Sequence, residues 1–96
     1  MVTGRVISLV IKLEPAGSRI LGYVYFKEIA PGEAVKTVEV ETASVLADYD
    51  KGGQLIGLEF LHAEDADSKL MRRLSEQFHL PELAGLDLAE MCKAAA

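Results

Sequence analysis

The spacing of the apolar residues changes once along this chain, close to His62, and this change limits the folds that are open to it. Before His62, as in residues 6–13, apolar and polar residues alternate at period two, which is typical of strands with one buried face. After it, Leu70, Leu74 and Phe78 recur every four residues, as on one face of a helix. Strands followed by helices predict an α+β fold, an antiparallel β-meander of four or five strands with C-terminal helices packing on one face.

Turn-forming residues divide the first part of the chain into separate strands. Pro15 with Gly17, and Pro31 with Gly32, separate the β-rich runs 6–13, 20–28 and 35–42. Residues 35–49 are either one long bent strand or two short ones. Residues 48–53, Asp-Tyr-Asp-Lys-Gly-Gly, predict a hairpin tip, and a return strand follows over residues 54–62.

The last third of the chain carries helix signals. The apolar spacing predicts a helix over about residues 64–78, with Asp65 and Asp67 in its first turn, where the helix dipole favours carboxylates. Asp87 and Glu90 have the spacing of an Asp variant of the capping box, so we expect a second helix over residues 88–95.

Length and charge exclude several classes of protein. With 96 residues we expect a single domain over residues 1–96, divided into a strand part (1–62) and a helical part (63–96). The 15 acidic residues outnumber the 10 basic ones, which are scattered, so we expect no nucleic-acid partner. We expect no membrane span, because no apolar run approaches the length that one needs, and the lone Cys92 favours the cytoplasm.

The middle of the chain resembles a known family. Residues 45–61, Val-Leu-Ala-Asp-Tyr-Asp-Lys-Gly-Gly-Gln-Leu-Ile-Gly-Leu-Glu-Phe-Leu, are similar to the signature of the bacterial and archaeal family known as domain of unknown function 2283. In this comparison, residues 23–26 correspond to the family's tyrosine-containing first strand and residues 37–41 to its second. The resemblance covers about residues 21–62 and departs from the family where an acidic pair usually precedes the first strand. Some members are encoded beside small toxin-like proteins, so the resemblance implies an antitoxin-like role.

The hairpin also matches part of a calcium-loop pattern. Asp48, Asp50, Gly53 and Glu59 occupy the first, third, sixth and twelfth positions of that pattern. However, the fifth position is Gly52, and strands rather than helices flank the loop. We therefore favour an ordinary Asp and Gly hairpin and keep Asp48, Asp50 and Glu59 as weak metal candidates.

One group of residues and one cysteine are further candidates for metal binding or catalysis. The group, which could ligate a transition metal, consists of His62, Glu64, Asp65, Asp67 and His79. An acidic helix start explains its carboxylates without a metal, and we favour that interpretation. Cys92 could be a nucleophile only with a base beside it, so a packing role is the stronger hypothesis. Nucleotide-binding loops and a serine-hydrolase elbow are missing from the sequence, and we expect no cofactor.

These observations favour a non-enzymatic, acidic protein-interaction module, antitoxin-like, with a small basic protein as partner. We also expect a homodimer, because the apolar runs 6–13 and 23–26 would be hazardous if left unpaired. It would form either by edge pairing or by packing of the Leu70, Leu74 and Phe78 helix across a two-fold axis. Eight residues are candidates for interaction: Tyr23, Tyr25, Leu70, Leu74, Phe78, Leu83, Leu86 and Met91. The alternative is a small-ligand or metal-binding domain that uses the 48–59 hairpin.

Overall fold

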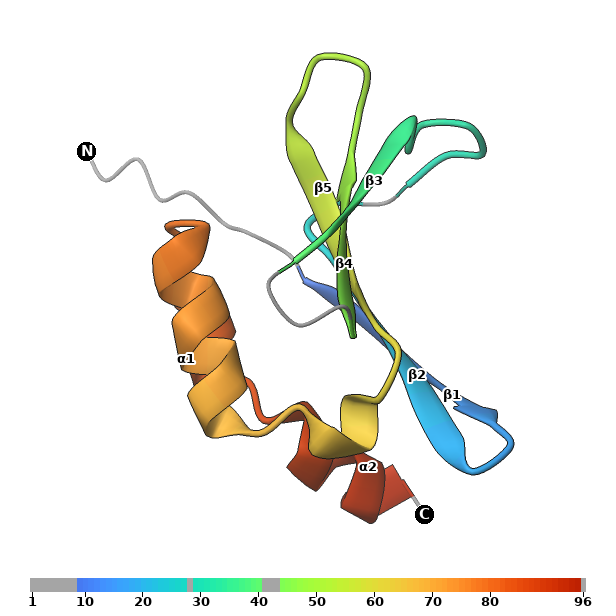
Figure 1. Ribbon diagram of the computed structural model, residues 1–96, viewed down its shortest axis with the longest axis vertical. Helices are drawn as coiled ribbons and strands as arrows, with labels where there is room; N and C mark the ends of the chain where they lie inside the picture. Colours follow the sequence, from blue (N-terminus) through green and yellow to red (C-terminus); the bar gives the residue numbers. More distant parts are fainter. Residues whose placement is uncertain (1–8, 28, 41–43, 96) are drawn as a thin grey trace, which may run out of the picture. The chain divides into compact units, whose positions relative to one another are not determined.

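Strands precede helices along the described chain, as the change of period predicts. The computed structural model describes residues 9–27, 29–40 and 44–95. Its elements are β1 (Val10–Ala16), β2 (Arg19–Tyr25), β3 (Lys36–Glu39), β4 (Val45–Tyr49), β5 (Leu55–Phe60), η1 (Ala63–Asp65), α1 (Ser68–Gln77), η2 (Pro81–Gly85) and α2 (Leu88–Ala95) (Figure 1). The α+β class with an antiparallel sheet is confirmed. The first residues of the run expected at 6–13, and the end of the run expected at 35–42, lie outside the described residues.

The strands form one sheet in the order β1-β2-β5-β4-β3. A strict meander would place β3 beside β2, whereas β5 takes that position, and Phe26 N–H donates to Ile56 O at 3.0 Å beyond the end of β2. Consequently the edges of the described sheet are β1 and β3. Residues 23–25 are not an unpaired edge, because β2 has a described neighbour on each side.

The stretch over residues 35–49 forms two short strands. β3 and β4 pair antiparallel, with Lys36 opposite Tyr49 and Glu39 opposite Leu46. The hairpin tip that follows β4 is confirmed, since Gly53 N–H donates to Asp50 O at 3.0 Å and Gly53 has a φ of 80°. Glycine adopts such a positive φ without strain, which is why the tip ends on this residue.

The chain divides into two compact units. The strand unit consists of Met1–Lys12 and Tyr23–Glu59, and the helical unit of Leu13–Gly22 and Phe60–Ala96. In the strand unit, the buried apolar residues are Val24, Val40, Val45, Ala47, Ile56 and Leu58. In the helical unit they are Phe60, Ala63, Ala66, Met71, Leu74, Leu83, Leu88 and Cys92.

The first helix begins later than the sequence predicts. Residues 63–65 form the separate 3-10 turn η1, and α1 starts only at Ser68, because the Asp67 carboxylate accepts the N–H of Leu70 at 3.0 Å. A side chain that binds a free N–H in this way caps a helix and sets its start. The second helix is confirmed as α2, with the Asp87 carboxylate accepting the N–H of Glu90 at 3.0 Å.

Packing inside the helical unit joins α1 to η2 and α2 to η1. The N–H of Ala89 donates to Ala66 O at 3.0 Å, so a main-chain bond also ties the start of α2 to the residue after η1. In the part of the chain that the structure describes, no helix is long and apolar enough to cross a membrane.

Gly22 provides a test of how closely the helical unit is packed. A Cβ at this position would lie 2.8 Å from the Cβ of Ala63, so Gly22→Ala forces the backbones of β2 and η1 apart. We expect the free energy of unfolding to fall by about 1–3 kcal/mol, the usual cost of overpacking. Urea unfolding measures this change.

Gly85→Ala is the matched control, because nothing lies within 4 Å of a Cβ built there. We expect it to be neutral, or to stabilise the fold by about 0.4–1 kcal/mol through the unfolded state. Equal stabilities of the two variants would contradict the close packing of Gly22 against Ala63.

Candidate interaction surface

β3 is an edge strand whose side chains are all exposed. It has β4 on one side and no described strand on the other. Val38, in the middle of the strand, is 39% exposed, and Val35, just before it, is 58% exposed. An exposed edge with apolar side chains is a surface on which another chain can add a strand.

The main-chain groups of β3 point alternately toward β4 and toward the open side. Val40 N–H donates to Val45 O at 2.8 Å, so the main-chain groups of Val40, just after β3, point toward β4. Because the direction alternates along the strand, the main-chain groups of Val38 also point toward β4. The main-chain groups of Thr37 and Glu39 point away from β4. Thr37 and Glu39 therefore offer their N–H and C=O groups at the outer edge.

Two shallow cavities border this edge. One, of about 400 Å³, is lined by Val35, Val38 and Tyr49 together with charged and glycine residues of the hairpin tip. The second, of about 360 Å³, shares Val35, Asp50 and Lys51 with the first and reaches the turn at Pro31. A strand added to β3 would find recesses here with both apolar and charged walls for its side chains.

Tyr23 and Tyr25 form a stacked pair on β2, with ring centroids 5.9 Å apart and an interplanar angle of 18°. Both are half-buried. A Cβ on Gly57 of β5 would lie 2.6 Å from Cδ1 of Tyr25, so the ring lies directly against the glycine. Burial raises the pKa of Tyr25, and the nearby charge of Glu59 raises it further. The sequence predicts Tyr23 and Tyr25 as interaction residues, and the structure shows them packed within the strand unit and partly exposed.

Two of the three weak metal candidates of the hairpin are engaged in hydrogen bonds, and the third has a raised pKa. The Asp50 Oδ1 atom accepts the N–H groups of Gly52 and Gln54, each at 2.9 Å, and so shapes the turn. The Asp48 Oδ1 atom accepts the Thr37 hydroxyl at 2.7 Å and thereby joins β4 to β3. Burial raises the pKa of the Glu59 carboxyl, and the charge of Asp48 raises it further.

Three of the five residues in the second candidate metal group lie close together. Among the described residues, His62, Glu64 and Asp65 place potential ligand atoms within 4.8 Å of one another, whereas Asp67 caps α1 and His79 is not in this group. The His62 Nδ1 atom lies 3.1 Å from the Glu64 Oε2 atom. His62 and Asp65 are exposed, and the contact between His62 and Glu64 joins two of the three residues at the start of η1.

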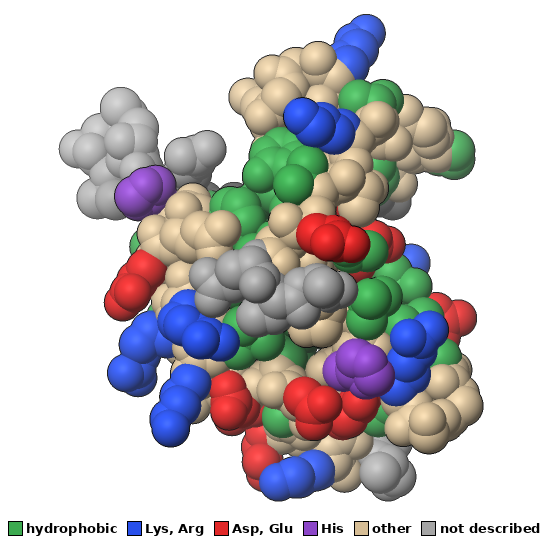
Figure 2. Space-filling view, viewed as in Figure 1, with side chains coloured by type: hydrophobic (Ala, Val, Ile, Leu, Met, Phe, Trp, Pro, Cys, Tyr) green, Lys and Arg blue, Asp and Glu red, His purple; other side chains and the backbone are tan. Residues whose placement is uncertain are grey.

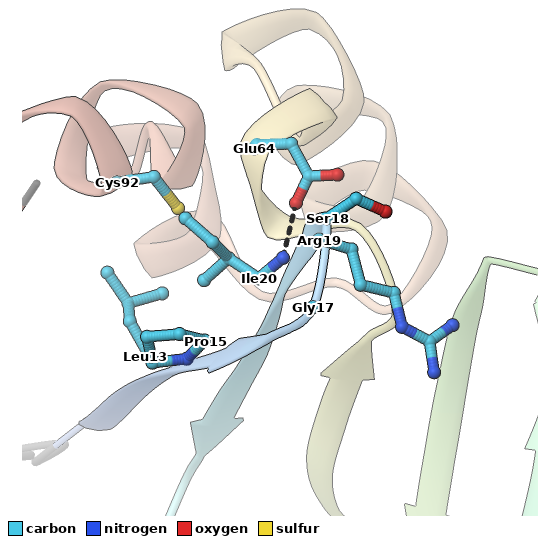
Figure 3. Close-up of a pocket in the computed structure, with 8 residues that line it drawn as sticks. All are labelled: Leu13, Pro15, Gly17, Ser18, Arg19, Ile20, Glu64 and Cys92. Carbon is cyan, nitrogen blue, oxygen red and sulfur yellow. Dashed lines mark hydrogen bonds between the residues drawn. The ribbon is translucent and has the colours of Figure 1, made fainter.

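A pocket of about 490 Å³ lies in the helical unit, between the β1–β2 turn and Cys92 (Figure 3). On one wall, the Ile20 N–H donates to the Glu64 Oε1 atom at 2.7 Å, and this bond lowers the pKa of Glu64. Cys92 is buried, and burial raises the pKa of its thiol, with the charge of Glu64 adding to the effect. A buried thiol with a raised pKa is a poor nucleophile, which favours the packing role over the nucleophilic one for Cys92.

The helical interaction candidates divide by burial. Leu74 and Leu83 are fully buried and belong to the core of the helical unit. Leu70, Phe78, Leu86 and Met91 are half-buried. The surface of α1 is instead formed by charged residues that include Lys69, Arg72 and Arg73, seen as a group of Lys and Arg side chains in Figure 2.

Sequence reasoning missed β3 as the exposed edge of the sheet. Its pattern of Val38 and Val40 alternating with Thr37 and Glu39 is the same for an edge strand as for an inner one. Edge strands are often short, but the run expected over residues 35–42 is of ordinary length, so its length gave no signal of an edge.

Comparison with known proteins agrees with the expected resemblance. Residues 22–64 match a family model described as Protein of unknown function (DUF2283). The matched segment contains β3, β4 and β5 completely, so the exposed edge and the hairpin lie inside it. Neither a curated protein nor a solved structure matches the chain.

Asp50→Ala removes the carboxylate that organises the hairpin tip. We expect the free energy of unfolding to fall by about 1–2 kcal/mol, because two main-chain N–H groups lose their acceptor. Thermal unfolding with and without millimolar Ca²⁺ measures the change. We expect the same loss in both solutions, and a stabilisation by Ca²⁺ in the wild type that Asp50→Ala abolishes would instead support the calcium loop.

Glu59→Gln and Glu64→Gln are expected to change stability in opposite directions at neutral pH. The raised pKa of Glu59 means that its charged form weakens the fold, so the stability it contributes in acid is lost as pH rises through its folded pKa. The lowered pKa of Glu64 means that its charged form stabilises the fold, and this contribution is lost as pH falls through its folded pKa.

Urea unfolding from pH 3 to pH 8 tests this pair. At pH 7 we expect Glu59→Gln to be more stable than the wild type and Glu64→Gln to be less stable. Both differences in the free energy of unfolding should shrink as pH falls below 4.5, the ordinary pKa of a glutamate carboxyl group. A loss of stability in Glu59→Gln at pH 7 would contradict the partly desolvated carboxylate.

Proposed function

We propose that this chain, whose residues 22–64 match the DUF2283 family, is a non-enzymatic protein-interaction module that binds another polypeptide by strand addition at β3. One observation carries the proposal. The N–H and C=O groups of Thr37 and Glu39 point away from β4, on a described edge with exposed valines. Main-chain bonds supply affinity in this mode of binding, and pockets beside the edge supply specificity.

The edge is partly protected from unwanted pairing, because β3 is short and carries Lys36 and Glu39, yet other protective features are missing from it. Proline, bulges and inward-pointing charges commonly block an edge. β3 has the sequence Lys-Thr-Val-Glu, with a single lysine and no proline. Its central side chain is Val38, so a partner strand gains apolar contact there in addition to hydrogen bonds.

A second surface fits the expected basic partner. Carboxylates gather over η1 and the start of α2, seen in red in the lower part of Figure 2, and the two elements pack together. Along the chain, Glu64 and Asp65 lie in η1, Asp67 caps α1, and Asp87 and Glu90 lie at the start of α2. Together with a formal net charge of -5, this surface favours a small basic protein over a nucleic acid. In its specific form the proposal is antitoxin-like, with a cytoplasmic complex between this chain and that basic protein.

An enzymatic role has less support from the residues described. Cys92 is held as a buried thiol, and the carboxylates of Asp48 and Asp50 are engaged by hydrogen bonds within the strand unit. A general acid or base needs a carboxyl group that can reach a bound substrate. The exposed main chain of β3 is, in contrast, a feature that binding uses directly.

Thr37→Pro tests strand addition. Proline removes the N–H that points outward at Thr37 and places its ring where an added strand would lie, yet leaves the bonds between Val38 and β4. Thr37→Ala is the matched control, because it removes the same hydroxyl and keeps the N–H. Tagged versions expressed at native level are purified, and proteins recovered in equimolar amount are quantified.

We expect the wild type and Thr37→Ala to recover the same companion and Thr37→Pro to lose it at least tenfold. Circular dichroism confirms that the variants fold. Equal recovery by folded Thr37→Pro and Thr37→Ala would contradict strand addition at β3.

A further inference from the structure

We infer that the strand which adds to β3 is β3 of a second copy of this chain, antiparallel, with Thr37 opposite Glu39 of the partner subunit. This inference rests on the proposed function, because it names the chain that occupies the same edge when no companion protein is bound. Three features of β3 support it: the direction of its main-chain groups, the position of Val38 and the order of its charges.

The main chain limits the possible registers. In a continuous antiparallel sheet related by a two-fold axis, residues whose groups point outward must face one another across the new pair. Within β3 these residues are Thr37 and Glu39. Three pairings are therefore open: Thr37 with the partner's Thr37, Glu39 with the partner's Glu39, or Thr37 with the partner's Glu39.

Only the third pairing uses every outward group of the strand. Each Thr37–Glu39 pair exchanges two N–H to O=C bonds, and the two-fold axis repeats the pair. In the Thr37–Thr37 register, Glu39 would instead face Val35, whose N–H already donates to Tyr49 O at 3.0 Å. The Glu39–Glu39 register leaves the groups of Thr37 without a partner inside β3.

The side chains select the same register. The axis then passes at Val38, so Val38 meets the partner's Val38 at a non-hydrogen-bonded position, where Cα atoms lie about 4.5 Å apart. Val38 is 39% exposed and lies opposite the buried Ala47 of β4. The pairing thus brings Val38 and Ala47 of one copy into line with the same two residues of the other copy, across the two-fold axis.

The charges are compatible with this arrangement. Glu39 faces the partner's Thr37, whose hydroxyl donates to Asp48 within its own copy, and Lys36 faces the partner's Val40, so like charges are not directly opposite. The Glu39–Glu39 register would place two carboxylates opposite each other, which destabilises a strand pair. The Thr37–Thr37 register would place Lys36 opposite the partner's Val38 and lose the apolar contact.

The short strand predicts a weak dimer. A pair of four-residue strands buries much less than the roughly 1,200–2,000 Å² of a standard stable interface. Dimerisation should therefore depend on concentration, and sedimentation equilibrium over micromolar to millimolar protein measures it. We expect the average mass to rise from monomer toward dimer over this range.

Two valines on opposite edges of the sheet give a matched test of the surface. Val38 on β3 and Val10 on β1 are 39% and 38% exposed, so replacing either by lysine costs the monomer a similar amount. We expect Val38→Lys to weaken dimerisation at least tenfold, because two ammonium groups meet at the axis, and Val10→Lys to leave it unchanged. Loss of dimer in Val10→Lys alone would overturn the inference in favour of β1.

Cross-linking tests the register. In a Cys92→Ala background, glutathione disulfide oxidises two thiols to one protein disulfide and is itself reduced to two glutathione molecules. We expect Val38→Cys to give a covalent dimer, because its Cα separation at the axis suits a disulfide, and Thr37→Cys to give at least tenfold less. The reverse yield would show the Thr37–Thr37 register and overturn the inferred one.

The outcomes separate this inference from the proposed function. A wild type that stays monomeric to millimolar concentration overturns the self-pairing of β3. If the companion recovered from cells is then still lost in Thr37→Pro and kept in Thr37→Ala, strand addition stands with a different chain as partner. If the companion is recovered equally with both, strand addition at β3 fails as well.

Discussion

The position of β5 between β2 and β4 is the constraint on which the sheet depends. β5 must approach a neighbour closely on each side, and small residues permit this. Gly57 leaves room for the ring of Tyr25, while Ile56 and Leu58 are almost completely buried. Because β5 takes the inner position, β3 is displaced to the edge of the described sheet, and the edge becomes the surface that is open to a partner.

Local interactions explain why much of the secondary structure could be predicted. The hairpin tip is formed by Asp50, which accepts two N–H groups close to it in sequence, and by Gly53 at positive φ. The start of α2 is likewise determined by Asp87, three residues before the N–H that it accepts. Such features depend on neighbours within a few residues, so a sequence pattern contains them.

Features that depend on distant residues could not be predicted in the same way. The strand order requires β2 and β5 to pair although they are far apart in sequence, and the alternation in each strand is compatible with several orders. The burial of Leu74 and Leu83 follows from packing of α1 against η2, so these residues are core residues, whereas periodicity also permitted an interaction surface. The anchoring of Glu64 by Ile20 N–H has no local sequence signal either.

The central claim is that the outer main chain of β3 binds another strand, and that the first such strand is its own copy. Amide hydrogen exchange at single residues, measured at increasing protein concentration, tests this most directly. The account predicts that the amides of Thr37 and Glu39 exchange rapidly in dilute protein and become protected as concentration rises, while the Val38 amide is protected throughout. Exchange at Thr37 and Glu39 that does not change with concentration would contradict self-pairing, and slow exchange already in dilute monomer would contradict an open edge.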